Sequence, residues 1–66
     1  MSGGRWFRVA NREVRVFSLG PDLWVGAVHR VHADGRTVFE WSGRFPSEEQ
    51  AERHAHSSAI WRAVLA

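Results

Sequence analysis

The four histidines carry the most specific chemistry in the chain, because imidazole nitrogens bind zinc and exchange protons near neutral pH. His29 and His32 are three residues apart in a predicted strand, which directs their side chains to opposite faces. His54 and His56 are two apart in a predicted helix and also diverge. No cysteine is present to complete a zinc site. The spacing indicates solvated or edge histidines, and we expect no metal and no other cofactor.

Serines and carboxylates near the helical histidines invite a catalytic interpretation. Ser57 and Ser58 follow His56 as a nucleophile follows a base, but a catalytic serine also needs an oxyanion hole and an oriented base. A serine in mid-helix without a glycine-rich turn has neither. Glu48 and Glu49 fall where a helix would begin, and the helix macrodipole favours carboxylates there. The sequence therefore predicts no catalytic residues and a protein that is not an enzyme.

Arginine and tryptophan interleave along the chain and give its strongest functional signal. A sheet bearing aromatic and arginine side chains can stack bases and hold phosphates. In the alternative interpretation, tryptophan fills a small core and arginine stems cover its rim. The candidate nucleic-acid contacts are Arg5, Trp6, Arg8, Arg30, Arg36, Trp41 and Arg44.

Charge adds little to that signal. The pI near 11.1 arises because all nine basic residues are arginine, and no lysine, tyrosine or cysteine titrates at intermediate pH. The net charge of +2, with seven carboxylates, implies weak long-range attraction of a polyanion. No apolar run approaches the roughly 20 residues that cross a membrane, and residues 1–4 lack the apolar core of a signal peptide. We expect a cytoplasmic protein without membrane contact.

Alternating apolar residues and turn residues predict an α+β fold in one domain, 1–66, with residues 1–4 as a loose end. Asn11 tolerates the left-handed region in the first turn, and Asp34-Gly35 favours a tight hairpin. Short links between strands favour an antiparallel meander of three or four strands. The predicted strands are 5–9, 13–19, 23–32 and 37–43, followed by one helix that begins at Ser47.

The predicted helix has start signals and a narrow packing stripe. Ser47 and Gln50 have the spacing of a capping box, in which each side chain bonds the backbone N–H of the other residue. Phe45, just before it, is a candidate core residue. The small residues Ala51, Ala55 and Ala59 lie along one stripe that can approach a sheet closely. A bulkier stripe of Ile60, Trp61, Val64 and Leu65 follows.

Strict alternation divides the sheet into two faces, and one helix covers only one of them. The more apolar face is the expected partner of the helix; it comprises Phe17, Leu19, Leu23, Val25, Ala27, Val31, Phe39 and Trp41. The other face has Val14, Val16, Trp24, Gly26, Val28, Val38, Arg30 and Glu40. Its apolar members need cover, which predicts a homodimer or another protein partner. The candidate interface residues are Trp24, Val28 and Val38.

Roughly the last two-thirds of the chain contain one ordered set of motifs: Trp24-Val25-Gly26-Ala27-Val28, Gly35-Arg36, Trp41-Ser42-Gly43-Arg44-Phe45, Ser47, Glu49 and Ala51. This set resembles the plant-type AP2/ERF DNA-binding domain, a three-stranded sheet packed on one helix. The sequence also resembles small bacterial sheet-plus-helix proteins of unknown function.

The residues that read DNA in AP2/ERF domains are mostly absent. Phe17 and Leu19 stand where two first-strand arginines would be, and Phe39 replaces another. Ala27 and His29 replace a glutamate and an arginine, so Trp41 alone keeps its place among the DNA contacts. The resemblance supports the fold rather than that mode of recognition. The sequence thus predicts a small, non-enzymatic, self-associating interaction module, or alternatively a nucleic-acid-binding domain using the arginine and tryptophan surface.

Overall fold

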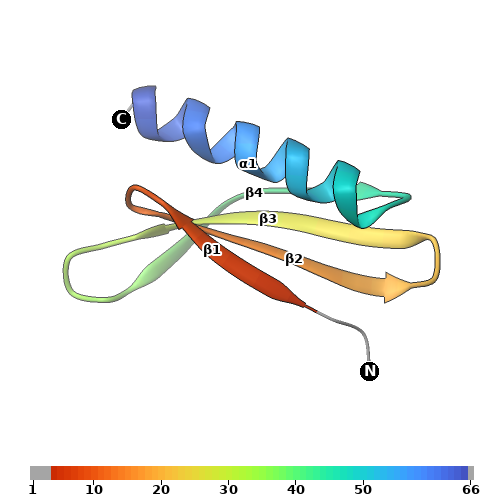
Figure 1. Cartoon of the computed structure of the whole chain (residues 1–66). Helices are drawn as coiled ribbons and strands as arrows, with labels where there is room; N and C mark the ends of the chain where they lie inside the picture. Colours follow the sequence, from red (N-terminus) through yellow and green to blue (C-terminus); the bar gives the residue numbers. More distant parts are fainter. Residues whose placement is uncertain (1–3, 66) are drawn as a thin grey trace.

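A computed structural model of the protein describes residues 4–65. Four antiparallel strands form one sheet in the order β1-β2-β3-β4, and a helix follows (Figure 1). The elements are β1 (Arg5–Val9), β2 (Arg12–Gly20), β3 (Leu23–Val31), β4 (Thr37–Phe45) and α1 (Glu48–Leu65). The predicted meander with one C-terminal helix is confirmed. Of the predicted loose end, residues 1–3 lie outside the described residues, and Gly4 is exposed before β1.

The first and third turns use positive backbone angles at single residues. In the β1–β2 turn Ala10 has φ of 53°, so Ala10 and not the predicted Asn11 takes the left-handed conformation. In the β3–β4 loop Gly35 has φ of 92°, as the Asp-Gly pair predicts. The carboxylate of Asp34 accepts the backbone N–H of Arg36 at 3.0 Å, which lowers the pKa of Asp34. Both hairpins are therefore fixed by local backbone geometry.

Helix α1 starts and packs through the residues that the sequence indicated. The backbone N–H of Gln50 donates to Ser47 Oγ at 3.3 Å, which confirms the cap, whereas the reciprocal bond from the Gln50 side chain is absent from the described residues. Ala51, Ala55 and Ala59 have no exposed surface and form the contact stripe. These methyl groups allow a close approach of helix and sheet.

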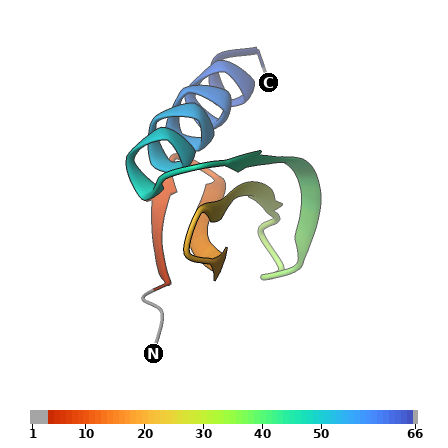
Figure 2. The ribbon, with the colours of Figure 1, turned by 90° about the vertical axis from the view of Figure 1, so that its right-hand side faces the viewer.

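The face of the sheet under α1 is the opposite of the one predicted. Val14, Val16 and Val28 are fully buried with the alanine stripe, whereas Phe17, Leu19 and Phe39 are exposed. Figure 2 shows α1 on one side of the sheet only. The physical reason is size, because the small side chains of this face match the alanines. At Gly26 an added Cβ would lie 2.8 Å from the Ala51 carbonyl oxygen.

A β-bulge in β4 explains why strict alternation misplaced Trp41. Val28 pairs with Trp41 and His29 pairs with Phe39, so Glu40 is an extra residue in the ladder. The extra residue shifts the second half of β4 by one position relative to the first half. Trp41 and Phe45 consequently pack against the core under α1, while Phe39 stays on the opposite face. Phe45, predicted as a core residue, is partly buried and packs against the edge of the core.

The face turned away from α1 is called the outer sheet face below. Its members follow from the strand register and from the alternation of side chains about the buried valines. They are Trp6, Arg8, Glu13, Arg15, Phe17, Leu23, Val25, Ala27, His29, Val31, Thr37, Phe39, Ser42 and Arg44.

Candidate functional site

The outer sheet face presents large aromatic side chains around a small apolar floor. Trp6 is 64% exposed on β1 and Phe39 is 58% exposed on β4, the two edge strands, and Phe17 projects from β2 beside Trp6. Val25 and Ala27 form the floor on β3 and are buried. No described element covers this face, which makes it the main exposed apolar surface of the sheet. Isolated exposed apolar residues are ordinary, but Trp6 and Phe17 line one shallow pocket together with Arg15, and grouped apolar side chains typically mark a binding surface.

Positive charge accompanies the aromatic residues. Arg8, Arg15 and Arg44 lie on the outer sheet face and are exposed. The carboxylate of Glu13 accepts a hydrogen bond from Arg15 Nε at 2.9 Å. Within residues 4–65, Arg8 and Arg44 form no ion pair. The surface therefore suits a partner that offers apolar or aromatic groups together with negative charge.

The predicted nucleic-acid contacts do not lie on one surface. Only Trp6, Arg8 and Arg44 belong to the outer sheet face. The other four are dispersed: Arg5 forms ion pairs with the helix, Arg30 and Trp41 lie on the helix side of the sheet, and Arg36 Nε bonds Asp34 in the β3–β4 loop. Arg15, Phe17 and Phe39 complete the surface instead. Alternation in the sequence had already placed Phe17 and Phe39 on the same face of the sheet, but that face was predicted to lie under the helix.

The predicted interface residues are divided as well. Val28 is fully buried beneath α1 and has no surface for another molecule. Trp24 is half-buried against the same core, and Val38 is 47% exposed. The three residues therefore do not form one continuous interface, because α1 covers Val28.

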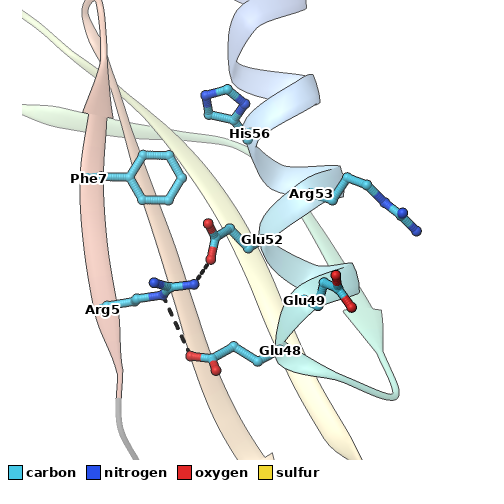
Figure 3. Close-up of a pocket in the computed structure, with 7 residues that line it drawn as sticks. All are labelled: Arg5, Phe7, Glu48, Glu49, Glu52, Arg53 and His56. Atoms are coloured by element: carbon cyan, nitrogen blue, oxygen red, sulfur yellow. Dashed lines mark ion pairs between the residues drawn. The ribbon is translucent and has the colours of Figure 1, made fainter.

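An open groove runs between β1 and the first half of α1 (Figure 3). Arg5 and Phe7 line it from β1, and α1 contributes Glu48, Glu49, Glu52, Arg53 and His56. Arg5 Nε lies 3.6 Å from a Glu48 carboxylate oxygen, and the Arg5 guanidinium also pairs with Glu52. In the close-up Glu49 and Arg53 point away from Arg5. The two carboxylates that face β1 are thus already occupied by a cation of the chain itself.

The histidines pack against phenylalanine rings. His54 stacks on Phe45 with ring centroids 4.8 Å apart, and His29 meets Phe39 edge-on at 5.7 Å. His29 Nδ1 is buried without a hydrogen-bond partner in the described part of the chain. Across residues 4–65, no three His, Asp or Glu side chains gather in an arrangement that could hold a metal ion. We therefore interpret the imidazole rings of His29 and His54 as packing groups.

The one buried charged side chain among the described residues has a structural role. Arg12 is 3% exposed on the helix side of β2, and its Nε donates to Glu40 Oε1 at 2.8 Å. A second guanidinium nitrogen donates to Asn11 Oδ1 at 2.6 Å. The Arg12 hydrogen bonds hold the pKa of Glu40 below its usual range. A carboxylate that stays ionised and doubly bonded serves as a structural anchor rather than as a proton donor.

Comparisons with protein-family models, curated proteins and solved structures gave no match to this chain. No helix within the described range is both long and apolar enough to span a bilayer.

Proposed function

We propose that the chain is a small, non-enzymatic interaction module that self-associates. The supporting observation is the exposed aromatic edge of the sheet, where Trp6 on β1 and Phe17 on β2 project into solvent and no described strand lies beside β1. A chain of 66 residues buries a smaller fraction of its surface on folding than a larger domain does, so association is a further source of stability. Trp6 is the most exposed aromatic residue of the outer sheet face and the best single probe of it.

Sedimentation velocity over a wide concentration range tests the proposal. We expect a reversible dimer, and replacement of Trp6 by serine should weaken dimerisation at least tenfold, because exposed tryptophan is the side chain most enriched among dominant interface contacts. Trp61→Ser is the matched control, since Trp61 near the end of α1 is 65% exposed but lies on the helix side of the molecule, where it lines a groove with Arg12. A strictly monomeric wild type contradicts self-association. A loss of dimer only in Trp61→Ser moves the surface to the helix.

A second candidate function, nucleic-acid binding, is favoured by one specific feature. Trp6, Phe17 and Phe39 share the outer sheet face with Arg8 and Arg44, which have no carboxylate partner in residues 4–65. Aromatic rings on a sheet stack unpaired bases, and neighbouring arginines neutralise the phosphates. Single-stranded nucleic acid fits this pattern better than duplex.

Quenching of tryptophan fluorescence by oligonucleotides tests this candidate. Binding to single strands should weaken steeply as salt increases, and Arg8→Gln and Arg44→Gln should each reduce the salt dependence. Arg53→Gln, an exposed arginine on α1, is the control that should leave binding unchanged. No binding at low salt to either single-stranded or duplex oligonucleotides would exclude the candidate.

A further inference from the structure

The two edges of the sheet differ in how open they are to another strand. β4 forms one edge, but the Glu40 bulge interrupts its ladder, and such bulges discourage pairing with further strands. β1 forms the other edge and is regular, with each of its five residues in register with β2. Along its outer side no described strand lies, so its backbone groups on that side are free to pair. β1 is thus the edge at which another strand can add.

Charge disfavours the simplest dimer, in which two outer sheet faces stack. That arrangement brings Arg8, Arg15 and Arg44 of each copy together, against only Glu13 from each. Burying like charges opposite one another is strongly unfavourable. An edge-to-edge dimer keeps these guanidinium groups at the solvent surface.

Building on the proposed self-association, we propose that the second copy docks at β1, with the two β1 strands antiparallel about a two-fold axis at Phe7. In this register all five residues pair, Arg5 opposite the partner's Val9, and Phe7 opposite the partner's Phe7. Trp6 then faces the partner's Arg8 on the outer side, twice by symmetry, which gives two cross-strand cation–π pairs. A shift of the register by two residues in one direction places Trp6 opposite the partner's Trp6, which removes the cation–π pairs. A shift by two residues in the other direction places Arg8 opposite the partner's Arg8, which brings like charges together.

The groove beside β1 accommodates this geometry on the helix side. The Phe7 ring lies 5.7 Å from the His56 ring, in the groove that opens at the β1 edge. Arg5 is neutralised within its own copy by Glu48 and Glu52, so it adds no net repulsion at the axis. The resulting dimer has one continuous sheet, and its two outer faces join into a single surface.

Cysteine cross-linking tests the register directly, because the chain contains no cysteine and any disulfide must come from an introduced one. Directly opposed residues of an antiparallel pair have Cα atoms about 4.5–5.5 Å apart, within disulfide range. Under mild oxidation Phe7→Cys should form a covalent dimer. Trp6→Cys mixed with Arg8→Cys should form the heterodimer, while each alone should cross-link poorly. The mixed pair replaces exposed side chains, so it remains informative if Phe7→Cys folds badly.

Phe17→Cys and Phe39→Cys, on the outer sheet face, distinguish the alternatives. If they cross-link and the β1 variants do not, edge docking is wrong although self-association stands. Efficient cross-linking of Trp6→Cys or Arg8→Cys alone overturns the register. If no variant cross-links while the wild type sediments as a dimer, docking at β1 is also wrong. A monomeric wild type without cross-links removes both the edge dimer and the proposed function.

Discussion

Arg12 and Glu40 join two strands that are not neighbours. The guanidinium on β2 reaches across β3 to the carboxylate on β4, with hydrogen bonds of 2.8 Å and 3.3 Å. Glu40 is the extra residue of the bulge, and the bulge places it on the same side of the sheet as Arg12. The irregularity in β4 therefore has an electrostatic partner built into β2.

Replacing Glu40 by glutamine should destabilise the protein by about 2 kcal/mol, because it leaves the buried Arg12 charge without a counterion. The pKa of Glu40 is lowered in the folded state, chiefly by its hydrogen bond from Arg12. Its contribution is therefore fully present above the ordinary carboxyl pKa near 4.5 and is lost as the pH falls through the folded value. Urea unfolding from pH 7 to pH 3 checks both effects. The variant should lose less stability than the wild type on acidification, and Asp22→Asn, in the exposed β2–β3 turn, should behave like the wild type.

Gly26→Ala should destabilise the protein by about 1–3 kcal/mol through overpacking. The added methyl would lie 2.8 Å from the Ala51 carbonyl oxygen and 2.9 Å from Ala55 Cβ, so α1 must move away from β3. Gly20→Ala is the matched control, because nothing lies within 4 Å of its Cβ position. Thermal unfolding of the two variants measures the difference. Equal stability of both would contradict the close helix–sheet contact.

The assignment of the two sheet faces can be tested with a pair of substitutions. Val28→Ala removes two methyl groups from a fully buried site and should cost about 2 kcal/mol of unfolding free energy. Phe39→Ser, on the outer sheet face at 58% exposure, should change the stability of the monomer by less than about 1 kcal/mol. Denaturant titration at a concentration low enough to avoid association separates the two. If Phe39→Ser were the more destabilising substitution, the face that carries Phe39 would be the one under α1, as alternation alone suggested.

Ala10→Gly should stabilise the protein, by about 0.5–1 kcal/mol. Ala10 has φ of 53°, a conformation that costs an L-residue with a Cβ atom roughly 1–2 kcal/mol, part of which is offset by the greater freedom of glycine in the unfolded chain. Ala33→Gly, in the β3–β4 loop without a positive φ, should be slightly destabilising. The midpoint of thermal unfolding reports both shifts. A lower midpoint for Ala10→Gly would show that the turn is not strained.

Local patterns were sufficient for the elements but not for their packing. Alternation, turn residues and the Ser47 cap predicted the strands and the helix, since each depends on neighbours in sequence. The face beneath α1 depends on matching sizes across a contact, which a count of apolar residues ignores. Gly26 and the buried valines are small, and the helix presents only alanines to them. That complementarity of small residues was the signal that could have identified the covered face.

The candidate site was partly misjudged for a second reason. Arginine and tryptophan residues were grouped by type, although their faces depend on register. Trp41 is separated from the exposed aromatic residues by a single inserted position, and Arg5 is drawn to the helix by carboxylates more than 40 residues away in sequence. Neither the insertion nor the ion pairs can be read from spacing. Trp6, Arg8 and Arg44 lie on one face, but Arg44 does so only because of the inserted residue.

The bulge at Glu40 also has an evolutionary consequence. Loss of that one residue would leave Phe39 opposite His29 and Trp41 opposite Val28, so the ladder would become regular and both rings would keep their faces. What would be lost is the carboxylate that pairs with the buried Arg12. We therefore expect relatives of this chain that lack the extra residue to lack the arginine at position 12 as well, because a buried charge without a counterion is strongly destabilising. The length of β4 and the residue at position 12 should thus change together.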